Sequence, residues 1–226
     1  TYVKLYDEER EQIVFFIVDR SLSMETGSSN LTRLNLASET GALLLLAANS
    51  NSCPVGCVFF DGKINFSCKP KNSLDQTMLI LSKFSRREEV VNTGSALSSA
   101  IKGAQQILKN RSLIFILSDF RCGDYEDNLA LLSQKHDVVA IRFTDANDFE
   151  LPNLGMVEVQ NPENQQKKIY PTFSSAFKRA WRENSNNQLE RWKYMCKKNG
   201  VVPLVISTAD NPALRLSRFF AVKERF

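Results

Sequence analysis

The chain has 226 residues, of which 43% are hydrophobic and 24% are charged, as expected of a globular protein with a sizeable core. Its net charge of +4 is small, and the basic residues of the C-terminal third alternate with Glu183 and Glu190, a pattern typical of a solvated helix face rather than a nucleic-acid patch. The longest apolar run, residues 42–48, is far shorter than the roughly 18 residues that span a bilayer. Composition therefore argues against nucleic acid as a partner and against a membrane span within this segment.

The first half of the chain alternates predicted strands and helices. Residues 13–18 form a continuous run of β-branched and aromatic side chains, typical of a strand that is covered on both faces. A helix is predicted over 32–49, and we expect its second half to be well buried because that half is apolar on nearly all sides. The dipeptide Asp61-Gly62 predicts a hairpin turn. The elements predicted around and after that turn are strands over 53–60 and 63–68 and helices over 73–84 and 96–108.

The second half continues the alternation. A polar stretch at 145–171 has room for a short hairpin, and a long helix is predicted over 173–198, broken or bent near 184–187, with Gly200 as its C-cap. The other predicted elements are a strand over 113–117, a helix over 125–134, strands over 137–143 and 201–206, and a helix from 211 to 220. This order predicts an α/β fold, a doubly wound, mostly parallel sheet with one antiparallel edge strand and helices on both faces.

The termini and the cysteines suggest where the chain works. The sequence has no internal repeat, linker or low-complexity segment, so we expect residues 1–226 to be a single domain. Because it begins at Thr1 without a methionine or an apolar leader, we expect it to be the C-terminal part of a longer protein. Five cysteines at irregular spacings favour reduced thiols over a disulfide framework, as in a cytoplasmic protein.

Oxygen-bearing side chains gather where the predicted parallel strands end. Asp19, Ser21 and Ser23 follow the first strand, Asp119 follows the strand at 113–117, and Thr93 precedes the helix at 96–108. Because ligands of parallel α/β sheets gather at the carboxyl ends of the strands, we expect these five residues to meet. Carboxylate and hydroxyl oxygens suit Mg²⁺.

The same five residues resemble the metal-ion-dependent adhesion site of von Willebrand factor A domains. The resemblance lies in Asp-x-Ser-x-Ser at Asp19–Ser23, the loop residue Thr93 and the strand-end Asp119. It implies a von Willebrand A-like, Rossmann-like fold that binds Mg²⁺ or Mn²⁺ and lets an acidic residue of a protein partner complete the metal shell. It implies a metal-dependent interaction module with no catalytic residues rather than an enzyme.

A narrower resemblance, to bacterial uncharacterised von Willebrand A-like proteins found beside MoxR-type AAA+ ATPases, covers nearly the whole chain. It is carried by the segments at 6–10, 19–24, 136–140, 151–152 and 217–220. It implies a MoxR-type ATPase as a partner. One departure is Asn92, which stands where the family usually has a glycine before the loop threonine.

Other interpretations stay open at this point. The five residues could serve as helix caps and turn formers, or the site could be a scaffold without a working metal. A strand ending in Asp19 also resembles haloacid dehalogenase-like phosphotransfer enzymes, but Ser21 stands where their second acid is needed. Arg20 and Arg121 flank the site and are either solvent-exposed or attract an acidic partner. We expect Asp145, Asp148 and Glu150 to form an ordinary turn and His136 to be structural.

Overall fold

The computed structural model describes residues 12–28, 31–85, 95–160 and 167–223. Within them a six-stranded sheet has the order β3-β2-β1-β4-β5-β8, and a separate two-stranded sheet joins β6 and β7. The strands of the main sheet are β1 (Ile13–Asp19), β2 (Val55–Phe60), β3 (Ile64–Lys71), β4 (Ser112–Ser118), β5 (Asp137–Thr144) and β8 (Val202–Ser207). All neighbours pair in parallel except β2 and β3, which form the antiparallel hairpin at one edge. The predicted fold class is confirmed.

The strand sequences explain their places in the sheet. β1 lies between β2 and β4, and its residues Val14–Val18 are buried, as its continuous β-branched and aromatic run predicts. β3 lies at the edge and its side chains are exposed or half-buried. An edge strand has one open side and therefore tolerates the lysines that β3 carries.

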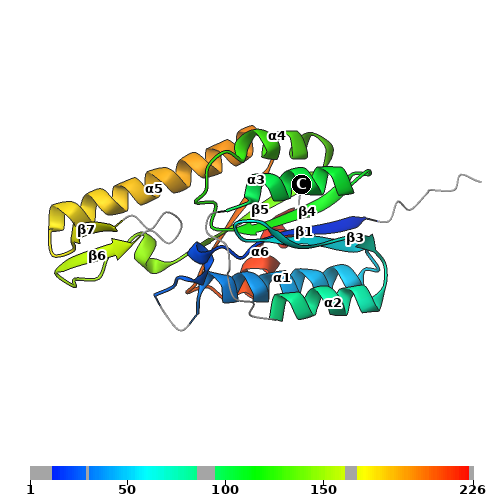
Figure 1. The fold of residues 1–226 in the computed structure, drawn as a ribbon, viewed down its shortest axis with the longest axis horizontal. Helices are drawn as coiled ribbons and strands as arrows, with labels where there is room; N and C mark the ends of the chain where they lie inside the picture. The colour runs from blue at the N-terminus through cyan, green and yellow to red at the C-terminus, as the bar shows by residue number, and fades with distance from the viewer. Residues whose placement is uncertain (1–11, 29–30, 86–94, 161–166, 224–226) are drawn as a thin grey trace, which may run out of the picture.

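Helices cover both faces of the sheet (Figure 1). One face packs against α1 (Arg33–Ser50), α2 (Leu74–Ser85) and α6 (Pro212–Lys223). The other packs against α3 (Leu97–Ile107), α4 (Glu126–Lys135) and the C-terminal half of α5 (Ser175–Lys198). Alternate side chains of β1 point into the two cores, with Phe16 in the first and Phe15 and Ile17 in the second.

Beyond the sheet, α5 projects toward the hairpin of β6 (Met156–Gln160) and β7 (Lys167–Pro171), which lies beside its N-terminal half (Figure 1). Tyr170 of the hairpin stacks on Phe177 and meets Trp181 edge to face, with ring centroids 5.4 and 5.6 Å apart. The predicted hairpin is confirmed. No helix in the described ranges is both long and apolar enough to cross a membrane.

Three expectations about helices are wrong. The second half of α1 is not buried on all sides, since Leu46 is 44% exposed; α1 covers one face of the sheet and keeps an outer side. The helix α5 is continuous where a break was expected near 184–187. Its Ser185 hydroxyl donates to the carbonyl oxygen of Asp148, 2.6 Å away, rather than competing for the backbone of its own helix. The C-cap of α5 is Asn199 rather than the expected Gly200; Gly200 is the next residue, and its φ of +71° provides the left-handed turn that ends the helix.

Candidate metal centre

The carboxyl ends of β1 and β4 bring two aspartates to one edge of the sheet. Val18 of β1 is in register with Leu117 of β4, so the next residues of the two strands, Asp19 and Ser118, lie side by side. The Ser118 hydroxyl donates to Oδ2 of Asp19 over 2.5 Å. Asp119 follows Ser118 directly, and both aspartates are almost completely buried.

The loop after β1 adds two hydroxyls to this edge. The Ser21 backbone N–H donates to Oδ1 of Asp19 over 2.8 Å, which folds the chain back toward the carboxylate. A short 3₁₀ helix, η1 (Leu22–Glu25), then begins, and its tight turn brings the Oγ atoms of Ser21 and Ser23 to within 3.1 Å of each other. Both serines are buried. Four of the five predicted ligands therefore lie in two adjacent loops at the same end of the sheet.

Thr93, the fifth predicted ligand, lies outside the described residues. The described chain resumes at Ser95, and the backbone N–H of Ala96 donates to the carbonyl oxygen of Asp61 over 2.8 Å. Asp61 follows the carboxyl end of β2, the neighbour of β1. The start of α3 is thereby anchored at the same edge of the sheet as Asp19.

The electrostatics of this edge suit a cation. Burial, together with the charge of Asp119, raises the pKa of Asp19 to about 7. Oδ2 of Asp119 is buried and has no hydrogen-bond partner among the described residues; the Arg121 Nε lies 3.8 Å away, beyond hydrogen-bonding distance. A divalent ion would provide the missing partner for that oxygen and offset the repulsion between the two carboxylates.

The chemistry of the ligand atoms limits which metal ions suit this edge. Across the described ranges there is no cluster of three or more His, Cys, Asp or Glu side chains that could hold a metal ion. The set at this edge is two carboxylates and two hydroxyls instead. Such oxygen ligands match a hard cation like Mg²⁺, which keeps several waters, better than zinc, which prefers nitrogen and sulfur.

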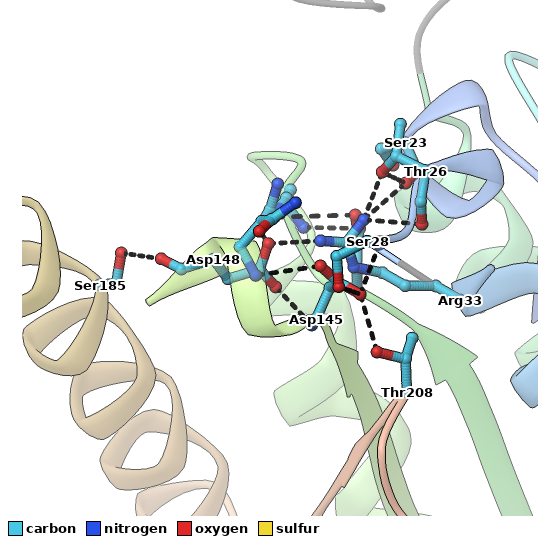
Figure 2. A network of polar contacts seen from close by, with 11 residues as sticks. Ser23, Thr26, Ser28, Arg33, Asp145, Asp148, Ser185 and Thr208 are labelled. Carbon is cyan, nitrogen blue, oxygen red and sulfur yellow. Dashed lines mark hydrogen bonds and ion pairs between the residues drawn. The ribbon is translucent and has the colours of Figure 1, made fainter. Parts of the chain in front are cut away.

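A second polar network holds in place the loop of residues 20–28 after β1, here called the serine loop (Figure 2). Arg33, at the start of α1 and 3% exposed, donates to the carbonyl oxygens of Ser23 and Thr26, each over 3.2 Å. It also forms an ion pair with Asp148. Asp148 lies in η2 (Ala146–Asp148), the short 3₁₀ helix after β5. The loop that carries the serines is thus held between α1 and the end of β5.

Asp145 joins the same network (Figure 2). Its Oδ2 accepts from the Ser28 backbone N–H and hydroxyl, both over 2.9 Å, and from the Thr208 hydroxyl over 2.7 Å. Its Oδ1 caps η2 by accepting from Asn147 N–H. The turn expected here exists. In addition, Asp145 contacts the serine loop directly and Asp148 contacts it through Arg33. Their position directly after a parallel strand was the one sequence signal for this role.

The two flanking arginines differ. Arg20 is 7% exposed, its guanidinium lies 4.7 Å from the centre of the Phe59 ring, and it donates to the carbonyl oxygen of Lys83, so it packs into the protein. Arg121 is half-exposed and forms an ion pair with Asp148 over 2.6 Å. Its backbone N–H donates to Oδ1 of Asp119 over 3.2 Å. Only Arg121 is available at the rim.

The histidine and the cysteines lie away from this centre. His136 is 4% exposed at the C-terminal end of α4, and burial lowers its pKa, as expected for a structural residue. All five cysteines are free thiols. Cys57 and Cys68 face each other across β2 and β3 with their Sγ atoms 3.5 Å apart.

The strand order and the helices on both faces of the sheet are those of a von Willebrand factor A-like fold. Two solved structures share this fold over most of their length. A conserved hypothetical protein BatB from Bacteroides thetaiotaomicron has a TM-score of 0.59 at 12% identity, covering 94% of this chain and 98% of its own. An aerotolerance-related membrane protein from Bacteroides fragilis has a TM-score of 0.57 at 15% identity, covering 94% and 99%.

Residues 1–191 match the model of the family described as "Protein of unknown function DUF58", and the chain belongs to that family. Among its relatives are the uncharacterised proteins Rv1480 of Mycobacterium tuberculosis and Mb1516 of Mycobacterium bovis. Each is 22% identical over 184 residues, which is 79% of this chain and 58% of the relative. The chain thus spans little more than half the length of these relatives. Neither the family description nor the relatives' names assign an activity.

Proposed function

We propose that this domain is a metal-dependent protein-interaction module rather than an enzyme. Mg²⁺ or Mn²⁺ is held by Asp19, Ser21, Ser23 and Asp119, with Thr93 as a further ligand. The observation that supports this most is the buried Oδ2 of Asp119, which has no hydrogen-bond partner in the described part of the chain and sits near a second buried carboxylate. A buried carboxylate oxygen that accepts no hydrogen bond is costly unless a ligand compensates it.

A divalent ion held by these residues would let a carboxylate of another protein complete its shell. The chain's own residues orient it: Ser118 and the Ser21 N–H fix the two oxygens of Asp19, and Arg33 holds the carbonyl oxygens of the serine loop. Because these groups are tied to β1, β4 and α1, the site is preorganised before a partner arrives. The partner we propose, from the family resemblance alone, is an acidic face of a MoxR-type AAA+ ATPase in the bacterial cytoplasm.

Calorimetric titration with MgCl₂ and MnCl₂ tests the metal site. We expect saturable binding by the wild-type chain and at least a tenfold weaker affinity in Asp19→Ala and in Asp119→Asn, because each removes a carboxylate ligand. Asp137→Asn is the matched control: it removes a carboxylate at the opposite, amino-terminal end of the sheet, where Asp137 pairs with Arg111. It should bind metal as the wild type does.

Two results would count against the proposal. If the wild type and both site variants bound the metal with equal affinity, the metal site would have to lie elsewhere on the chain. No binding of either ion by a folded wild-type chain, together with capture of the MoxR-type ATPase in EDTA, would make the domain a metal-independent scaffold. Far-UV circular dichroism of each variant separates loss of the ligand from loss of the fold.

A further inference from the structure

A cleft of about 550 Å³ lies next to the candidate metal centre, between the loop after β4 and the middle of α5. Its size is that of a site for a small ligand or a peptide side chain. Arg121 belongs to both places, because its backbone N–H donates to Asp119 while its side chain lines the cleft. The residues that matter here are Arg121, Arg142, Trp181, Arg191 and Trp192.

Buried donors without acceptors distinguish this cleft. Nε of Arg142 and the indole Nε1 atoms of Trp181 and Trp192 are buried and have no hydrogen-bond partner in the part of the chain that the structure describes. An indole or guanidinium N–H can only donate, so these three groups lack acceptors, not donors. Buried polar groups in folded proteins are nearly always paired, and three orphans of one type around a single cleft indicate a ligand that carries an acceptor.

The surroundings of Arg142 favour an anionic acceptor. Its guanidinium carbon lies 5.4 Å from the centre of the Trp192 ring, which positions the charged group by a cation–π contact. Burial, followed by the charge of Arg121, lowers the pKa of Arg142. Two acids partly compensate the charge of Arg142: Asp119, which also pairs with Arg121, and Asp148, which is shared between Arg33 and Arg121. An anion beside Arg142 would therefore offset the cost of burying its charge and the repulsion between Arg142 and Arg121.

The charged side chains of the cleft also bear on which class of anion it would bind. Three arginines (Arg121, Arg142 and Arg191) and three acids (Asp124, Glu126 and Asp148) line the cleft, so its charged side chains balance. Because these charges balance, the cleft has no excess of positive charge that would favour a doubly charged phosphate over a singly charged carboxylate. A planar carboxylate also matches the planar fork of an arginine, which can bind both of its oxygens.

We propose that this cleft binds a carboxylate group through Arg142, with Arg191 at its rim and the indole N–H groups as further donors. The carboxylate belongs to a free small carboxylic acid or to an acidic side chain of a bound peptide. The site is distinct from the metal centre and does not require the metal.

Intrinsic tryptophan fluorescence reports on this site directly, since the chain has only two tryptophans and both line the cleft. The protein is titrated in EDTA with glutarate, with the peptide acetyl-Gly-Glu-Gly-amide and with inorganic phosphate, each against NaCl of equal ionic strength. We expect a saturable change in emission with a carboxylate, at least tenfold weaker in Arg142→Gln. Arg191→Gln provides a second variant if Arg142→Gln does not fold. The matched control is Arg182→Gln, on the same helix but paired with Glu150 outside the cleft.

Each outcome decides a separate point. If glutarate and the peptide bind with similar affinity, the ligand is an acidic segment of a partner protein. If glutarate alone binds, the ligand is a free acid. Both results support the proposal. Tighter binding of phosphate than of either carboxylate, or equal affinity in Arg142→Gln and the wild type, overturns it. So does the absence of both a saturable change in emission and calorimetric heat with every carboxylate. Asp19→Ala should keep the cleft's affinity, so failure of the metal site and failure of this site are distinguishable.

Discussion

At the scale of single residues, Asp145 shows how hydrogen bonds determine the charge state of a buried acid. Burial alone would raise the pKa of Asp145, but the donors Ser28, Thr208 and Asn147 all favour the ionised form and lower it to about 2. The carboxylate accepts hydrogen bonds from the serine loop, from η2 and from the residue after β8, and so links these three segments. Its ionised form therefore contributes to the stability of the whole sheet edge.

We predict that Asp145→Asn lowers the free energy of unfolding at pH 7 by about 1–3 kcal/mol, the range for hydrogen bonds to a charged group. The folded-state pKa lies below the ordinary value of 3.8, so this stabilisation is present above about pH 4 and is lost as the pH falls toward 2. Urea denaturation between pH 7 and pH 2.5 measures it.

The difference between wild type and Asp145→Asn should shrink as the solution is acidified below pH 4. A constant difference over the whole pH range would show that the charge of Asp145 contributes nothing. Asp75→Asn, an exposed carboxylate in the first turn of α2, serves as the control for general effects of charge.

At the scale of elements, a single glycine sets how closely α1 and α2 pack. A Cβ added at Gly41 of α1 would lie 2.3 Å from Cε1 of Phe84 at the end of α2. That ring cannot easily move, because it packs edge to face against Phe16 and Phe59 at centroid distances of 5.9 and 5.2 Å. Gly103 of α3 offers the opposite case, since its added Cβ would meet Cδ1 of Ile64 at an ordinary 3.6 Å.

We predict opposite effects for the same substitution at these two helix-interior positions. Gly41→Ala should destabilise the fold by about 1–3 kcal/mol, because overpacking outweighs the gain in helix propensity. Gly103→Ala should stabilise it by about 0.5–1 kcal/mol, because only the propensity changes. Chemical denaturation of both variants tests this, and a stabilised Gly41→Ala would show that α2 can shift away from α1.

At the scale of the whole molecule, Arg33 connects segments that are far apart in the sequence. It binds the carbonyl oxygens of Ser23 and Thr26 and the carboxylate of Asp148, 115 residues further along the chain. The carbonyl oxygen of Asp148 then accepts from Ser185, which joins the projecting helix α5 to the same network (Figure 2). One buried guanidinium thus links α1, the serine loop and η2 and, through Asp148, also α5.

We predict that Arg33→Met lowers the free energy of unfolding by about 2–4 kcal/mol, because it leaves buried carbonyl oxygens and part of a carboxylate without a donor. Thermal and urea denaturation measure the change. Arg111→Met is the matched control: Arg111 also makes two hydrogen bonds to one aspartate, but its side chain is 75% exposed. Solvent screens that pair, so no resolvable loss is expected. Similar losses in the two variants would contradict the role given to burial.

The sequence by itself determined the strands of the main sheet, their mostly parallel pairing and the two aspartates that reach its carboxyl edge. Continuous runs such as 13–18 predict buried parallel strands, and parallel strands necessarily end at one edge, so Asp19 and Asp119 could be brought together without coordinates. The structure confirms the placement of these two with Ser21 and Ser23. The ligand roles of all five residues, and the metal itself, stay predictions.

Only the tertiary structure decided which polar groups face one another across loops. Hydrophobic periodicity is local and records which side of an element is buried. The contacts of Asp145 with Ser28 and of Asp148 with Arg33 instead join residues 117 and 115 positions apart and depend on how the loops pack. The continuity of α5 and the cleft beneath it have the same origin. Both depend on long-range contacts, one through Ser185 and the other through Trp192 packed on Phe120, which no local pattern encodes.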